Sequence, residues 1–127
     1  MKRYLIILFL AGCATRQPPA PEAPAEPPPA PETPIARETI AVAGLIESAR
    51  SDAAAGRLVQ AAGTLERALR IEPRNPRLWH ELARVRLRQG DTAQAANLAA
   101  RSNSFAGNDA ALRSANQNII EQARTGR

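Results

Sequence analysis

The sequence predicts an all-α fold, in which about five helices over residues 36–127 follow a long proline-rich segment. Three observations support this prediction. The C-terminal part is rich in alanine, arginine and leucine and poor in aromatic and β-branched residues, a composition that favours helix. It matches itself at an offset of 34 residues, and each copy has a glycine near its middle. We therefore expect two pairs of helices, each joined by a tight turn, and one last helix.

The first residues have the features of an export signal. Lys2 and Arg3 precede a short apolar run, residues 4–11, which falls well short of the roughly 20 residues that a membrane-spanning helix needs. A basic start, a brief apolar core and small residues before a cleavage point are typical of a cleaved signal. The run ends in LAGC, which resembles the lipobox of bacterial lipoproteins. This resemblance predicts a signal peptide over residues 1–12 and lipidation of Cys13, whereas the alternative is a plain secretory signal with an incidental cysteine.

Lipidation of Cys13 predicts a membrane-anchored mature protein. Two or more acyl chains hold a protein stably at a bilayer, whereas one chain does so only marginally. Cys13 is the only cysteine, so the mature chain has no disulfide and folds by packing alone. In enteric-type bacteria, an Asp directly after the lipidated cysteine favours retention in the inner membrane. Because Ala14 stands there, the lipobox resemblance implies the outer membrane, with the chain facing the periplasm.

A proline-rich linker is expected over residues 13–35. Half of the residues from Gln17 to Pro34 are proline, which lacks an N–H donor and fixes φ, so this segment forms neither helix nor central strand. Polyproline II geometry rises about 3.1 Å per residue, which gives these residues a reach of roughly 55 Å. We expect a spacer that holds the domain away from the membrane. The alternative is a PxxP ligand for an aromatic groove.

The two copies of the repeat share small and turn-forming positions. At the 34-residue offset the aligned pairs are Leu45 with Trp79, Ala49 with Ala83, Gly56 with Gly90, and Ala61 with Ala95. A glycine commonly ends a helix, and Asp91 or Thr92 can cap the helix that follows Gly90. A helix–turn–helix unit of 34 residues is the signature of the tetratricopeptide repeat, which the chain resembles.

This resemblance includes the turn between the repeats but does not extend to a third repeat. The first copy ends in residues 73–76, Pro-Arg-Asn-Pro, similar to the PxNP turn of the family. Asp52 and Arg86 stand where the family prefers a large aromatic residue, and Gly107 stands where its proline would be. The resemblance therefore implies two repeats and a different C-terminal element.

The last segment predicts a single amphipathic helix. It begins after the cap candidates Asn108 and Asp109. Its apolar residues share one helical face: Leu112, Ala115, Ile119, Ile120 and Ala123. Since two repeats fall below the usual three needed for stability, we expect this helix to close the open end of the core. An isolated helix that binds a partner is the alternative.

The composition argues against catalysis. His80 is the only histidine, no lysine follows Cys13, and the acidic residues show no metal-ligand spacing. A nucleophile that acts without histidine would need a recognisable motif, and none is present. We therefore expect no enzyme, no catalytic residue, no metal and no cofactor.

Positive charge is the remaining signal of function. From residue 37 onward there are 14 arginines and 9 acidic residues. Arg77, Arg84 and Arg88 are spaced i, i+7 and i+11, so they share one stripe of a helix. In tetratricopeptide proteins the first helix of each pair lines the concave surface. By position, this resemblance assigns to a partner-binding concave face Ile46, Arg50, Arg77, His80, Arg84, Leu87 and Arg88. The planar fork of arginine suits carboxylates and extended backbones.

A solvated basic face is the alternative to a binding surface. Local pairs such as Arg77 with Glu81 and Glu47 with Arg50 would contribute only about 0.3–0.5 kcal/mol each. We do not expect nucleic acid as a partner, because the chain carries an export signal and its arginines have no interleaved aromatic residues for stacking. Contact with anionic glycan or lipid stays open.

The order of lipid anchor, spacer and helical-repeat domain predicts a binding protein of the periplasm. This layout resembles the small tetratricopeptide lipoproteins of gammaproteobacteria that activate class A penicillin-binding proteins. In those systems an outer-membrane lipoprotein reaches through the cell wall and stimulates a bifunctional peptidoglycan synthase in the inner membrane. The resemblance implies such a partner, and the spacer favours it, because a protein that works at the outer membrane needs no reach. The alternative is an accessory factor, such as a pilotin or a subunit of outer-membrane protein assembly.

Overall fold

All secondary-structure elements in the described part of the chain are helices. The computed structural model describes the backbone of residues 34–126 and the side chains of residues 39–126, so the predicted signal peptide, Cys13 and most of the predicted linker lie outside it. Within these bounds there are five helices: α1 (Pro34–Ala54), α2 (Leu58–Ile71), α3 (Pro76–Arg88), α4 (Thr92–Phe105) and α5 (Ala110–Thr125). The predicted all-α class is confirmed. Helix α1 begins at Pro34, within the last residues that the sequence assigned to the linker.

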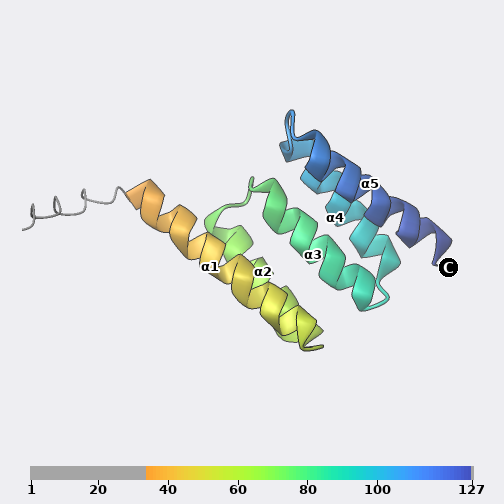
Figure 1. Cartoon of the computed structure of the whole chain (residues 1–127), viewed down its shortest axis with the longest axis horizontal. Coiled ribbons are helices and arrows are strands. Elements are labelled where there is room, and N and C mark those ends of the chain that lie inside the picture. The colour runs from red at the N-terminus through yellow and green to blue at the C-terminus, as the bar shows by residue number, and fades with distance from the viewer. Residues whose placement is uncertain (1–33, 127) are drawn as a thin grey trace, which may run out of the picture. The chain divides into compact units, whose positions relative to one another are not determined.

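The helices form two layers (Figure 1). Helices α1, α3 and α5 lie in one layer, with α2 and α4 behind them. Helix α3 is central, because it packs against each of the other four helices. The first layer thus holds the first helix of each predicted repeat, as the resemblance to the repeat family implied, together with the C-terminal helix.

The turns form at the residues that the sequence indicated. Gly56 and Gly90 follow α1 and α3 with φ of 80° and 83°, a region that glycine enters without steric cost. Asp91 and Asp109 each accept a hydrogen bond from a backbone N–H in the first turn of α4 and α5. Asn75 does the same for α3 and is followed by Pro76 at the first helical position.

Two apolar clusters form the core. The larger lies among α1, α2 and α3, and its largest fully buried side chains are those of Leu65 and Leu78. The smaller lies among α3, α4 and α5; its buried members are Ala83, Ala95, Ala99 and Ile119, and the half-buried Leu87, Leu98 and Ile120 pack against it. Alanine lets helix backbones approach closely, so this second cluster is thin.

Helix α5 packs on α3 and α4 and is not an isolated helix. Of its predicted apolar face, Ile119 and Ala123 are buried, and Leu112, Ala115 and Ile120 are half-buried. The prediction that this helix closes the end of the repeat is confirmed in its position.

Candidate partner-binding site

The predicted site residues come together on the layer of α1, α3 and α5. Four hollows lie along this layer and share lining residues with one another. The predicted residues among their linings are Ile46, Arg50, Arg77, His80, Arg84, Leu87 and Arg88. We call the surface that these hollows form the concave face. Ile46 differs from the rest because it is 8% exposed and belongs mainly to the core.

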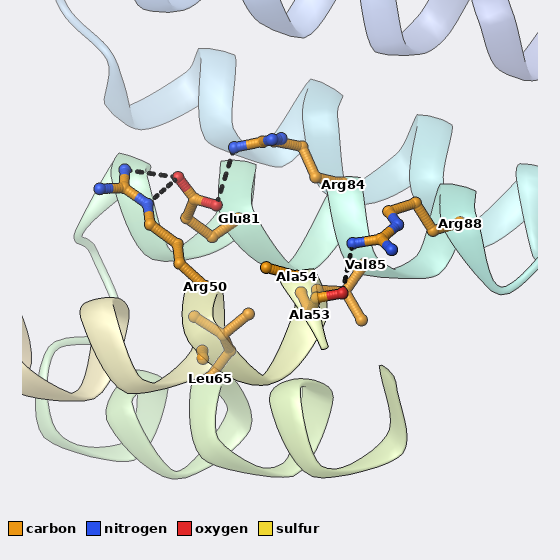
Figure 2. Close-up of a pocket in the computed structure, with 9 residues that line it drawn as sticks. Arg50, Ala53, Ala54, Leu65, Glu81, Arg84, Val85 and Arg88 are labelled. Carbon is orange, nitrogen blue, oxygen red and sulfur yellow. Dashed lines mark hydrogen bonds and ion pairs between the residues drawn. The ribbon is translucent and has the colours of Figure 1, made fainter. Parts of the chain in front are cut away.

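A pocket of about 220 Å³ lies between α1 and α3 (Figure 2). Its rim carries four charged side chains, Arg50, Glu81, Arg84 and Arg88. Its remaining lining is apolar: Ala49, Ala53, Ala54, Leu65 and Val85. The pocket thus combines an arginine-rich rim with an aliphatic floor.

Glu81 is the buried centre of this rim. Its Oε1 accepts hydrogen bonds from Arg50 Nε at 3.0 Å and Arg50 Nη2 at 2.7 Å. Its Oε2 accepts one from Arg84 Nη1 at 3.2 Å. The glutamate side chain is 7% exposed, whereas those of Arg50 and Arg84 are 46% and 55% exposed. One buried carboxylate is therefore shared by two half-exposed guanidinium groups, and their common rim keeps a net positive charge.

The predicted pair of Arg77 with Glu81 is wrong: Glu81 pairs with Arg50 and Arg84 instead. The predicted pair of Glu47 with Arg50 is present at 2.7 Å. The hydrogen bond with Glu81 raises the pKa of the Arg50 guanidinium, although burial acts against it. Arg50 is therefore a fixed positive charge. Sequence reasoning missed Glu81 because its register along α3 looks like that of a surface residue.

The two outer arginines of the face differ from each other. Arg88 donates from Nη1 to the carbonyl oxygen of Ala53 at 2.7 Å, which ties the end of α3 to the end of α1. Arg77 is exposed in the first turn of α3 and forms no ion pair with another described side chain. Arg77 is therefore the arginine of the concave face most available to an acidic group.

A buried polar network joins α3, α4 and α5 beside these arginines. His80 Nδ1 lies 2.8 Å from Oδ1 of Asn116, a residue with no exposed surface. Asn116 Nδ2 lies 2.8 Å from Ser102 Oγ and 2.8 Å from Asn103 Oδ1. Ser102 Oγ lies 2.8 Å from the carbonyl oxygen of Pro76. The predicted site residue His80 is therefore bound to the core on one side of its ring.

Sequence reasoning also missed Asn116. Its position was the available signal, since it falls four residues after Leu112 and three before Ile119, on the apolar stripe of α5. A polar residue on such a stripe is buried with its polar atoms paired.

Two classes of feature are not found within the described residues. No group of His, Cys, Asp and Glu side chains between residues 39 and 126 is arranged to hold a metal ion. No helix of the described chain is both long enough and apolar enough to span a membrane.

The fold and the site define a helical-repeat scaffold with an arginine-rich concave face. The sequence profile of the tetratricopeptide repeat matches residues 52–119, more than half of the chain. The chain belongs to the tetratricopeptide repeat family.

A solved structure, the globular C-terminal domain of P. aeruginosa LpoP, is similar in both sequence and fold. The identity is 42%, the match covers 67% of this chain and 80% of that one, and the TM-score is 0.66. No curated protein sequence matches the chain significantly.

Proposed function

We propose that the chain is an outer-membrane lipoprotein that binds and activates a bifunctional peptidoglycan synthase, a class A penicillin-binding protein. The observation that carries this proposal is the 42% identity to the C-terminal domain of LpoP over 67% of this chain. The order of lipobox, proline-rich segment and repeat domain, which resembles the lipoprotein activators of this class of synthase, supports it as well. Tetratricopeptide repeats are stacked helix pairs whose curved surfaces bind other proteins, which fits an activator that works by contact.

In this proposal each segment has one task. Cys13 carries the acyl anchor, and the proline-rich residues 13–35 give the domain its reach toward the inner membrane. The helical domain supplies the contact. Its concave face offers Arg77 and the outer edges of Arg50 and Arg84, so we expect the synthase to present acidic groups there.

The proposal is tested by reconstituting the synthase with the full-length lipoprotein in detergent. Addition of the lipoprotein should raise the rate of glycan polymerisation from lipid-linked precursor, and the effect should saturate with its concentration. A rate that does not change at saturating lipoprotein contradicts the proposal. Binding without stimulation would instead support the alternative of an accessory or assembly factor.

The anchor is tested separately by Cys13→Ser. Without acyl chains the protein should leave the outer-membrane fraction for the periplasmic extract, because two or more chains are what hold a lipoprotein stably. Fractionation of cells that express either form, followed by immunoblotting, measures this. A variant that stays in the outer-membrane fraction would refute the lipobox interpretation.

A further inference from the structure

The polar network around Asn116 has only one consistent arrangement of hydrogens. The carbonyl oxygen of Pro76 can only accept, so the hydroxyl of Ser102, which lies 2.8 Å away, donates its single proton to it. Ser102 Oγ has no proton left for Asn116, so the Asn116 atom facing it must be the donating Nδ2. That amide also donates to Asn103 Oδ1. The other amide atom of Asn116, the acceptor Oδ1, therefore faces His80.

This arrangement fixes the tautomer of His80. Because Asn116 Oδ1 can only accept, His80 Nδ1 must carry a proton and donate across the 2.8 Å separation. In a neutral imidazole the second nitrogen then has a free lone pair and acts as an acceptor. The fold thus holds Nε2 of the neutral ring as an acceptor.

Nε2 of His80 is open to solvent, and His80 belongs to the concave face. His80 lines two adjoining hollows, one between α3 and α5 and one that also includes Arg50 and Arg77. Among the described side chains that are not exposed, Arg86 Nε is the only buried polar atom without a partner. Nε2 of His80 also has no hydrogen-bond partner among the described residues. Because it is not one of the buried atoms without a partner, it is reachable from solvent. Arg84 lines both hollows together with His80.

We propose that His80 is a specificity-determining residue of the concave face, which accepts a hydrogen bond from an N–H or O–H group of the synthase. This inference rests on the proposed function and deepens it. The neighbouring guanidinium groups of Arg77 and Arg84 can only donate, so they select acceptors such as carboxylates. His80, which lies between them along α3, instead requires a hydrogen-bond donor from the partner. A partner with acidic groups but no donor at this point leaves Nε2 desolvated and unpaired, which weakens its binding.

The tautomer is tested on the lipoprotein alone. His80 is the only histidine, so long-range ¹H–¹⁵N NMR of the full-length protein in detergent reports on it without assignment. The expected spectrum at neutral pH shows a protonated Nδ1 and an unprotonated Nε2. A proton on Nε2, in either the other tautomer or the imidazolium, overturns the inference and leaves the proposed function untouched.

Two substitutions separate the role of the acceptor Nε2 from that of the donor Nδ1. His80→Asn keeps an amide N–H near the position of Nδ1 but has no group at the position of Nε2. His80→Gln reaches the position of Nε2 with its amide oxygen and has no group at Nδ1. For the full-length lipoprotein and the synthase, His80→Asn should weaken binding about three- to tenfold, as expected for one hydrogen bond. Compared with His80→Asn, His80→Gln should keep more of the affinity for the synthase and lose more of the thermal stability.

The outcomes distinguish the inference from the function on which it rests. If the parent binds the synthase and His80→Asn binds as tightly, the inference is overturned and the function stands. If the parent does not bind the synthase, both fall. If His80→Asn does not fold, the NMR spectrum of the parent and the affinity of His80→Gln decide, and a Gln variant that binds no better than His80→Ala overturns the inference.

Discussion

Helix α3 is joined to its two neighbours in the first layer by different chemistry. Toward α1 it meets a cluster rich in leucine, and beside this cluster the buried Glu81 binds two half-exposed arginines. Toward α5 it meets a smaller cluster whose buried members are three alanines and Ile119, with the hydrogen-bonded network of His80 and Asn116 beside it. We call these two contacts the α1 seam and the α5 seam. Apolar volume holds the helices together at the α1 seam, and satisfied buried hydrogen bonds do so at the α5 seam.

The difference has a consequence for how the repeat ends. A cluster of small side chains buries little apolar area, so it contributes little free energy to holding a helix in place. Asn116 reaches Ser102 and Asn103 of α4 and His80 of α3, which fixes the register of α5 against both helices at once. A fully satisfied buried network specifies one arrangement, because any shift leaves polar atoms unpaired.

The largest effect is expected from removing α5, with truncation after Gly107. This exposes the cluster around Ala95 and Ala99, removes the burial of Ile119 and leaves Ser102 without its partner on α5. A small domain has only about 5–15 kcal/mol of net stability, so the truncated protein should lose most of its cooperative thermal unfolding. Circular dichroism measures this, and an unchanged melting curve would show that α5 does not close the core.

The next largest effect is expected on the leucine side. Leu65 has no exposed surface, so Leu65→Ala removes a buried side chain and leaves a cavity, at a cost of about 2–5 kcal/mol. Ile119→Ala in the thinner cluster should cost less, because Ile119 is already 5% exposed and has fewer apolar neighbours to lose. Urea unfolding of both variants decides this. Equal costs would contradict the contrast between the seams.

A smaller effect is expected for Asn116→Leu, which keeps the size of the side chain and removes its hydrogen bonds. His80 and Ser102 lose their partner, at a cost of about 1–3 kcal/mol. Asn118→Leu is the matched control, since Asn118 is exposed on the same helix. If the two substitutions change the unfolding midpoint equally, the network does not stabilise α5.

The smallest effects are expected at the ion pairs of the α1 seam. Glu81→Gln should cost about 1 kcal/mol, because the lost carboxylate is buried but its arginine partners can turn to water. Glu47→Gln removes a pair whose glutamate side chain is 71% exposed, and it should cost at most about 0.5 kcal/mol. Denaturant unfolding of the two variants tests the order, and a larger loss for Glu47→Gln would contradict it.

The sequence could predict the scaffold because its signals are local and periodic. The 34-residue offset, the turn glycines Gly56 and Gly90, and the cap Asp91 all depend on neighbours along the chain. The all-α class and the shared layer of α1 and α3 followed from them.

The sequence could not predict the polar contacts between helices. Glu81 was expected to pair along its own helix with Arg77, but the packing of α1 brings Arg50 to it from 31 positions earlier in the chain. Asn116 interrupts the apolar face of α5, and only the positions of Ser102 and His80 in space show why it is tolerated there. The expected concave residues did come together, yet which of their atoms are free depends on those contacts.

The central claim is that the concave face receives the synthase, and a matched pair of double variants tests it most directly. Arg77→Glu with Arg84→Gln changes the charge of α3 on the concave face. Arg67→Glu with Arg70→Gln makes the same change at exposed positions of α2 in the other layer. The measurement is stimulation of glycan polymerisation by each full-length lipoprotein over a concentration series. The concave variant should need roughly tenfold more protein for half-maximal stimulation, while the α2 variant should match the parent. Equal curves for the two variants would contradict the claim and move the contact away from the concave face.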